Sequence, residues 1–364
     1  MMNRKRFLHL MGAGLVGVAG GSMLAACGGA GAESDAAAAK NWIWMGGDRG
    51  ALDDWRRTFA RMRAAGLDGV LLKIEDVEEE PVEAVLEAAA DEGLEVHAWV
   101  ITMMRGEQME AHPDWYAVNR NGVSTAEDPP YVDYYRFLSP CPTPVRDYLA
   151  GHFDRIAQTE GLAGVHLDYI RFPDVILPIT LQPEYGLNQD KEYPEFDYGY
   201  HPECRAQFEA QTGIDPLELD DPPANEEWVR FRYGQITRVV NRLAEVVHGR
   251  GKLLTAAVFP TPDIARRLVR QNWPAWPLDA VMPMMYHNFY DEPVGWVRTA
   301  TEEGLAALNG KCPLYSGLFV PELTPDELVA AIDYARTGGA SGVSLFDVGA
   351  MTDAHWTRLS EVLA

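Results

Sequence analysis

Eight short apolar runs alternate with eight stretches of helical periodicity along most of the chain. The apolar runs cover residues 42–45, 69–74, 96–101, 164–172, 253–259, 279–286, 314–320 and 342–348. The helical stretches cover residues 53–65, 81–92, 144–159, 225–248, 264–271, 294–308, 324–336 and 353–363. Strands that alternate one by one with helices build a parallel sheet, and eight such units close into a barrel. We therefore predict an α/β fold, a (β/α)8 TIM barrel.

An open, doubly wound sheet is the rival arrangement for such a pattern. It would place a phosphate-binding GxGxxG turn after the first strand, but residues 45–50 read MGGDRG and lack that spacing. The chain has 364 residues, which exceeds a typical barrel of about 250 residues. Two long loops after the third and fourth apolar runs, residues 102–143 and 173–224, account for much of the excess.

The first 27 residues have the organisation of an export signal. Arg4, Lys5 and Arg6 form a positive start, and an apolar, glycine-rich segment follows up to Met23. The segment ends in Leu-Ala-Ala-Cys, which is similar to the bacterial lipobox, whose cysteine, here Cys27, is lipidated. We expect a signal peptide over residues 1–27, a flexible tether over 28–39 and one barrel domain over 40–364. The protein would then be exported and attached to a bacterial membrane by its lipid alone, on the periplasmic or cell-surface face.

The formal net charge of −23 narrows the choice of partners. Nucleic acids are bound through clusters of cations, so we expect no nucleic-acid partner, and we expect a neutral ligand rather than a polyanion. Among the cysteines after Cys27, Cys141 and Cys204 both fall in the long loops, where a disulfide is as compatible with the sequence as two free thiols. Cysteine and histidine spacings typical of zinc sites are absent from the sequence, so we predict neither metal nor cofactor.

Barrel enzymes carry their chemistry on the loops that follow the carboxyl ends of the strands. Both long loops belong to this class, and both are rich in tyrosine. Aromatic faces suit the C–H faces of sugar rings, and tyrosine hydroxyls can bond sugar hydroxyls. The same residues could instead pack the loops onto the rim of the barrel, so the composition alone leaves both roles open.

The fourth apolar run, GVHLDYIRFP, contains the most informative polar residues. Strand alternation places His166 and Asp168 on one face, directed into the barrel, and the apolar residues between them on the other. A carboxylate near the end of a barrel strand is placed to act as nucleophile or base. The alternative is a purely structural Asp168, paired with Arg171 or His166, because a buried charge needs a partner.

Hydrolysis of a glycosidic bond usually needs two carboxyl groups. Other strand ends offer three candidates to work with Asp168, namely Glu75, Glu322 and Asp347. Each has a structural alternative: Glu75 begins an acidic run, Glu322 precedes a helix start, and Asp347 could bond groups inside the rim. The sequence leaves the partner of Asp168 open.

Further polar and aromatic residues are candidates to bind a substrate. Tyr286 and His287 stand at the end of the sixth apolar run and could bind substrate hydroxyls, and Trp44 lies on the first run. His97 and Trp99 share a face of the third run, where they could line the floor of a sugar site or equally well pack in the core. The chain has no GxSxG elbow and no HExxH motif, which argues against esterases and zinc peptidases.

Several of these segments together resemble the glycosyl-hydrolase-like family 10 domain, which is common in exported bacterial lipoproteins. The resemblance rests on Ser139-Pro140, Pro144-Val145-Arg146-Asp147-Tyr148, residues 164–173, Phe231-Arg232, Ala256-Ala257-Val258-Phe259-Pro260 and Gln271-Asn272-Trp273 with residues 281–286. It covers most of residues 40–364 and implies a TIM-barrel glycosidase that acts on a cell-envelope or environmental polysaccharide. The family's aspartate on the fourth strand corresponds to Asp168.

These observations lead to one hypothesis and one alternative. The hypothesis is a lipid-anchored glycoside hydrolase in which Asp168 works with one of the three other carboxylates, while His166, Arg171 and Tyr286 orient the substrate. The alternative is a carbohydrate-binding lipoprotein that retains the barrel without catalysis.

Overall fold

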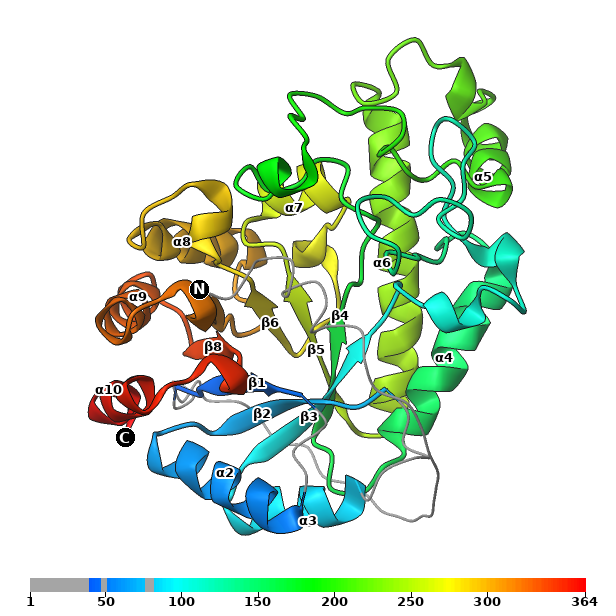
Figure 1. Ribbon diagram of the computed structural model, residues 1–364. Coiled ribbons are helices and arrows are strands. Elements are labelled where there is room, and N and C mark those ends of the chain that lie inside the picture. The colour runs from blue at the N-terminus through cyan, green and yellow to red at the C-terminus, as the bar shows by residue number, and fades with distance from the viewer. Residues whose placement is uncertain (1–38, 47–50, 76–81) are drawn as a thin grey trace.

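The computed structural model describes residues 39–46, 51–75 and 82–364, and these form a ring of parallel strands surrounded by helices (Figure 1). The strands are β1 (Trp42–Met45), β2 (Gly69–Lys73), β3 (Glu95–Ile101), β4 (Gly164–Asp168), β5 (Leu253–Val258), β6 (Ala280–Pro283), β7 (Ser316–Phe319) and β8 (Val343–Phe346). The helices are α2 (Leu52–Ala64), α3 (Val82–Asp91), α4 (Thr143–Ala157), α5 (Pro202–Thr212), α6 (Glu226–Gly249), α7 (Pro262–Val269), α8 (Trp296–Leu308), α9 (Pro325–Thr337) and α10 (Asp353–Leu363).

The strand order is β6-β5-β4-β3-β2-β1-β8-β7, and every pair of neighbours is parallel. Two isolated parallel bridges, Val281 with Leu314 and Met284 with Gly317, join β6 to β7 and close the ring. The predicted (β/α)8 barrel is thereby confirmed. Because all strands run the same way, their carboxyl ends and the loops that follow them lie at one mouth of the barrel.

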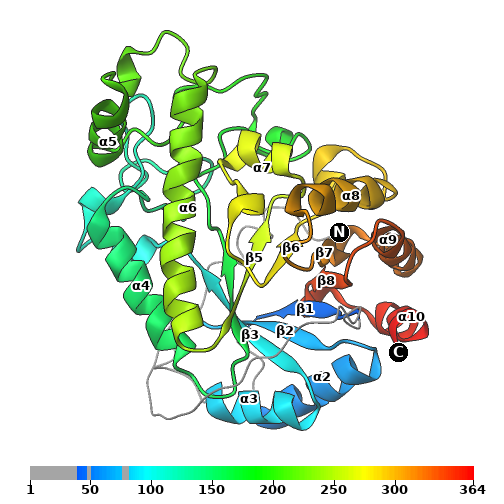
Figure 2. The same cartoon turned by 180° about the vertical axis from the view of Figure 1, so that it is seen from behind.

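The helices follow their sequence signals closely. Helix α9 begins where Thr324 caps it, with Pro325 at the first position and Glu327 completing a reciprocal capping box. Helix α6 begins at Asn225, whose side chain accepts a hydrogen bond from the Trp228 amide. Its apolar face packs on the barrel, while its opposite face is exposed (Figure 2).

Two parts of the chain differ from the expected pattern. The fourth strand ends at Asp168 rather than at residue 172, because Tyr169 has a φ of 49° and turns the chain out of the strand. Helix α5 was not expected; it lies within the second long loop, beside α6 and away from the barrel (Figures 1 and 2). The predicted signal peptide with Cys27, and the tether up to residue 38, lie outside the described residues.

Large rings fill the barrel interior because two strand positions lack side chains. A Cβ added to Gly69 would lie 2.3 Å from the Trp42 ring, and one added to Gly164 would lie 2.7 Å from the His97 ring. Both distances are far below a normal contact, so glycine at these positions makes room for the indole and the imidazole. The interior is therefore a packed core rather than a channel.

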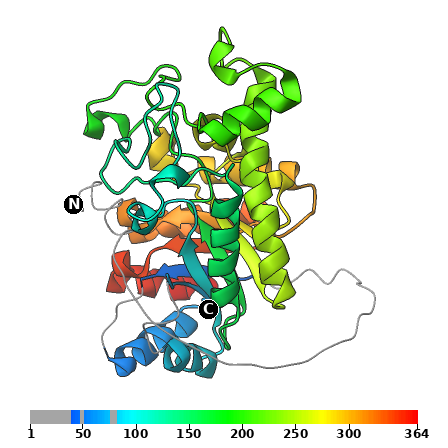
Figure 3. The same cartoon turned by 90° about the vertical axis from the view of Figure 1, so that its right-hand side faces the viewer.

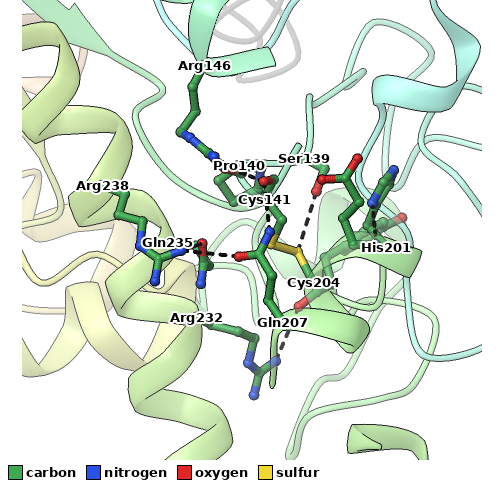
Figure 4. The surroundings of a disulfide bond; sticks show 12 residues. Ser139, Pro140, Cys141, Arg146, His201, Cys204, Gln207, Arg232, Gln235 and Arg238 are labelled. Atoms are coloured by element: carbon green, nitrogen blue, oxygen red, sulfur yellow. Dashed lines mark hydrogen bonds between the residues drawn. A yellow bond between two sulfur atoms is a disulfide. The ribbon is translucent and has the colours of Figure 1, made fainter. Parts of the chain in front are cut away.

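The two long loops lie together over the carboxyl ends of the strands (Figure 3) and share a second small core. A disulfide between Cys141 and Cys204, with a Cα separation of 5.3 Å, joins the start of α4 to α5 (Figure 4). Both sulfurs are buried. The side chains that pack around them are Tyr200, Phe208, Trp228 and Phe231. The disulfide that the sequence left open is thus present.

A buried charge cluster fixes the second long loop to the barrel beside this core. Asp197 is completely buried and forms an ion pair with Arg232, and Arg270 lies 3.7 Å from the same carboxylate. Burial opposes the ionisation of Asp197, but Arg232, Arg270 and Arg120, whose Nε lies 3.5 Å from the carboxylate, outweigh it and hold its pKa below the usual value. The Tyr200 hydroxyl donates to Asp197 over 2.9 Å, which connects the charge cluster to the second core.

We predict that the double substitution Cys141→Ser, Cys204→Ser lowers the free energy of unfolding by about 2–5 kcal/mol, because the bridge closes a loop of 63 residues in the unfolded chain. Denaturant unfolding followed by tryptophan fluorescence measures the change. Cys312→Ser is the matched control, since Cys312 is outside the disulfide. An unchanged unfolding midpoint in the double variant would show that the bridge is dispensable.

Candidate active site

A narrow pocket of about 60 Å³ opens at the barrel mouth beside the end of β4. Its lining comes from β4, from both long loops and from the segment after β6. The lining residues are Tyr131, Tyr135, Asp168, Tyr169, Arg171, Asp174, Leu177, Pro178, Leu181, Phe259, Met284, Tyr286, Phe289 and Tyr290. The pocket thus combines one acidic strand end with many aromatic rings, a composition typical of ligand sites.

Asp168 is held at this position by two hydrogen bonds, one to each carboxyl oxygen. The Trp99 indole donates to Oδ2 over 2.9 Å, and the Tyr169 amide donates to Oδ1 over 2.7 Å. The second bond depends on the left-handed backbone at Tyr169, a conformation that is costly for a non-glycine residue and that is common at functional sites. The turn also brings the Tyr169 ring into the pocket lining.

The surroundings of Asp168 affect the pKa of its carboxyl group in opposite directions. Burial raises the pKa of its carboxyl group, while the two hydrogen bonds and the charges of Lys73 and Arg171 act in the other direction. Burial is the larger influence, so the pKa is raised. A buried carboxyl with a raised pKa retains its proton at a higher pH than a free aspartate and is suited to donate it.

Lys73 lies on the barrel side of this carboxyl, over the Trp99 ring with its Nζ 4.8 Å from the ring centroid. Its Nζ lies 2.5 Å from Glu75 Oε1. Burial lowers the pKa of Lys73, although Glu75 and Asp168 counteract it. Trp99 therefore contacts two titratable groups: its ring faces the Lys73 ammonium group, and its N–H donates to the Asp168 carboxyl group.

Arg171 and Asp174 form a compact triangle with Tyr135 in another part of the pocket. Arg171 Nη1 donates to Asp174 Oδ2 over 2.8 Å, and Nη2 donates to the Tyr135 hydroxyl over 2.7 Å. The Tyr135 hydroxyl in turn donates to Asp174. The guanidinium carbon lies between 4.8 and 5.7 Å from the centroids of four aromatic rings, those of Tyr135, Phe137, Tyr169 and Phe259. Asp174 is thus neutralised by a fixed arginine.

Tyr286 follows β6, and its ring centroid lies 6.4 Å from that of Phe346 at the end of β8. Burial raises the pKa of its phenol well above the usual value, and the negative charges of Asp168 and Asp347 add to the effect. Both carboxyl groups are therefore near the same phenol. Asp347 follows β8, is half-buried, and its Oδ1 accepts a hydrogen bond from the Ala350 amide over 3.1 Å.

The other two predicted carboxylates have different neighbours. Glu75 is held between Lys73 and Arg105, whose Nη1 lies 3.0 Å from Glu75 Oε2. Glu322 accepts a hydrogen bond from the Asn288 side chain over 2.7 Å. Like Asp347, both lie outside the pocket lining.

Three of the predicted substrate-binding residues lie deep in the barrel rather than in the pocket lining. His97 and His166 are buried and both contact the Thr255 hydroxyl, at 3.1 and 2.9 Å, and Trp44 packs on His166 with ring centroids 5.6 Å apart. The Thr255 hydroxyl can donate its single proton to only one of the two imidazoles. The other imidazole therefore donates its N–H to the Thr255 oxygen. These side chains pack in the barrel core, outside the pocket lining.

His287 follows β6 but is also outside the lining, half-buried near Glu322. Burial lowers the pKa of its imidazole, although Glu327 and Glu322 counteract the shift. Trp99 is buried too, and it reaches the site only through its bond to Asp168. Of the predicted site residues, the pocket therefore brings together Asp168, Arg171 and Tyr286.

Sequence reasoning missed Asp174 and the turned Tyr169. Asp174 stands three residues after Arg171 in the segment RFPD, a spacing at which opposite charges can pair, and this was the available signal. Within residues 39–46, 51–75 and 82–364, no three His, Cys, Asp or Glu side chains gather as a metal site. Across the same residues no helix combines the length and the apolar character needed to span a membrane.

Comparisons with known proteins agree with the barrel fold. No family model and no curated protein matches the chain, so the resemblance to the glycosyl-hydrolase-like family 10 domain stays a prediction. Similar solved structures include the PgaB (BpsB) glycoside hydrolase domain from Bordetella bronchiseptica, with a TM-score of 0.65 and 14% identity over 88% of this chain and 98% of that one.

Two further solved structures share the fold. The catalytic domain of a β-amylase from Paenibacillus polymyxa has a TM-score of 0.60 and 10% identity, over 89% of this chain and 97% of that one. A β-galactosidase from Marinomonas ef1 has a TM-score of 0.59 and 11% identity, over 89% of this chain and 59% of that one. At these identities the likeness establishes the TIM-barrel fold alone.

We predict that Lys73→Met raises the pKa of Asp168 further, because it removes a cation that favours the carboxylate, whereas Lys73→Arg keeps the charge and the pKa. Arg171, Tyr169 and Tyr286 are the other titratable groups near Asp168, and both variants leave them in place. Carboxyl ¹³C NMR titration, with the Asp168 signal assigned from its loss in Asp168→Asn, measures the shift. A pKa that falls in Lys73→Met would contradict this account.

Proposed function

We propose that the protein is a glycoside hydrolase whose central catalytic residue is Asp168. One observation carries the proposal: a buried carboxyl group with a raised pKa lies at the end of a barrel strand, in a pocket lined by tyrosines. A proton donor beside aromatic rings fits a bound sugar, because the rings stack on its C–H faces and the carboxyl group reaches its glycosidic oxygen.

Asp168 acts as the general acid in this proposal. The acid must carry its proton before it gives it to the leaving oxygen, and burial extends the protonated form to higher pH. The sign follows directly: activity declines as the pH rises through the raised pKa of Asp168. Trp99 and the Tyr169 amide hold the carboxyl group in one orientation, so the proton points toward the pocket.

Asp347 is the proposed second carboxylate, acting as nucleophile or as base for water. Its charge and that of Asp168 both raise the pKa of Tyr286, which supports a location of the two carboxyl groups near the same phenol. Glu75 already balances Lys73 and Arg105, and Asp174 already balances Arg171. Tyr286 and Arg171 would then orient the sugar, and the acidity of the whole chain favours a neutral polysaccharide of the cell envelope or the environment.

Leaving-group dependence separates the two proposed roles. With an ordinary sugar leaving group, Asp168→Asn and Asp347→Asn each lower kcat/KM by roughly 10²–10⁴-fold. With a 2,4-dinitrophenyl leaving group, which needs no protonation, Asp168→Asn recovers most of the rate of its first step while Asp347→Asn stays impaired. Steady-state kinetics on paired aryl glycosides and oligosaccharides measures both effects.

The exposed Asp133 of the first long loop offers a control, because Asp133→Asn removes a carboxylate from outside the pocket. Full turnover by Asp168→Asn on an ordinary substrate would contradict the assignment of the acid. Sugar binding without any product, from the wild type as well, would favour the carbohydrate-binding alternative instead.

We further propose that the protein is exported and anchored by a lipid on Cys27. The proposal rests on the sequence of the first 27 residues. The buried disulfide between Cys141 and Cys204 supports the export but not the lipid, because such bonds persist in oxidising compartments and are rare in the cytosol.

The lipid anchor has a simple test in bacterial cells that express the full chain. We expect labelled palmitate to enter the wild type and the protein to sediment with membranes, while Cys27→Ser abolishes both. Cys312→Ser provides the control, since it removes a thiol without touching the predicted lipobox. Unchanged labelling of Cys27→Ser would refute the anchor.

A further inference from the structure

Five residues of the pocket lining have apolar side chains and come from two segments. Leu177, Pro178 and Leu181 come from the second long loop, and Met284 and Phe289 come from the segment after β6. The two segments are joined by a hydrogen bond from the Thr180 amide to the Phe289 carbonyl over 3.3 Å. These five lining residues are called the apolar wall below.

The backbone amides of this wall are already engaged within the protein. Leu177 donates to the Gln189 side chain over 2.8 Å, and Leu181 donates to the Pro178 carbonyl over 2.9 Å. Phe289 donates to the Tyr286 carbonyl over 2.9 Å and Met284 to the Val258 carbonyl over 2.8 Å, while Pro178 has no N–H. The wall therefore offers no amide donor to a ligand.

Apart from Phe259, the remaining lining residues carry polar groups. They are Asp168, the paired Arg171 and Asp174, and the hydroxyl-bearing tyrosines. A ligand that fits both parts has several hydroxyl groups on one side and an apolar group on the other. A hydroxyl group placed against the wall would lose hydrogen bonds to water and would find no free amide donor there. Burial of a methyl group at the same place is favourable.

From this division we infer that the pocket selects a 6-deoxyhexose, in which a methyl group replaces the C6 hydroxymethyl of an ordinary hexose. The methyl group lies against Leu177, Leu181 and Phe289, and the ring hydroxyls face Asp168 and the tyrosines. An N-acetyl group fits less well, because its amide also needs partners. The inference deepens the proposed glycosidase activity and rests on it for the catalytic step, although sugar binding tests it separately.

Matched sugars that differ by one hydroxyl group test the inference on the wild-type protein. The pairs are L-fucose with L-galactose, L-rhamnose with L-mannose, and 6-deoxy-D-glucose with D-glucose. Isothermal titration calorimetry gives Kd for each free sugar, and kcat/KM is compared for the corresponding aryl glycosides. We expect the 6-deoxy member of at least one pair to bind about 10–100-fold more tightly.

Two leucine-to-asparagine variants test whether the apolar wall causes the preference for 6-deoxy sugars. Leu181→Asn adds an amide to the apolar wall and should bring the ratio within the preferred pair close to one. Leu187→Asn makes the same change in the same loop at a half-buried position outside the lining, and should keep the wild-type ratio.

The outcomes separate this inference from the proposed function. A 6-deoxy preference in binding with no hydrolysis of any glycoside supports the inference and contradicts the glycosidase proposal. Hydrolysis with equal or weaker use of the 6-deoxy member overturns the inference alone. Failure of every 6-deoxy sugar to bind, a stronger preference for N-acetylglucosamine over glucose, or equal effects of the two variants also overturns it.

Discussion

The hydrogen bond from the Trp99 indole to Asp168 connects the packing of the barrel interior to the chemistry of its mouth. The indole is held in place by close-packed rings, and glycine at positions 69 and 164 makes room for large rings in that interior. Lys73 lies over the same indole, so one side chain positions both a cation and a carboxylate. Burial of Asp168 is tolerated because these contacts satisfy it, and the same burial raises its pKa.

Residues of the two long loops surround the end of β4 and form the pocket with it. Their own core, with the disulfide and the Asp197 charge cluster, makes them a stable layer over the barrel mouth rather than loose connections. The fixed triangle of Arg171, Asp174 and Tyr135 forms one part of the lining, and the apolar wall forms another. Ligand selection in this account therefore resides in the inserted segments, whereas proton transfer resides in the barrel itself.

The alternation of strands and helices was sufficient to predict the barrel, and the period of two within β4 was sufficient to direct Asp168 inward. The left-handed turn at Tyr169 was beyond such reasoning, because no glycine marks it. The neighbours of Asp168 could not be predicted from the sequence either, because they depend on which strand ends lie close together across the barrel. For His97 and His166, strand alternation predicted that the side chains point into the barrel. It could not predict that both contact the Thr255 hydroxyl in the core.

The account's central claim is that Asp168 serves the hydrolysis of glycosidic bonds, and incubation with a glycan panel in H₂¹⁸O tests it most directly. Mass spectrometry detects the new reducing end, which gains one ¹⁸O atom if water cleaves the bond. The account predicts labelled products from the wild-type protein and none above background from Asp168→Asn. Labelled products from both proteins alike, or from neither, would contradict it.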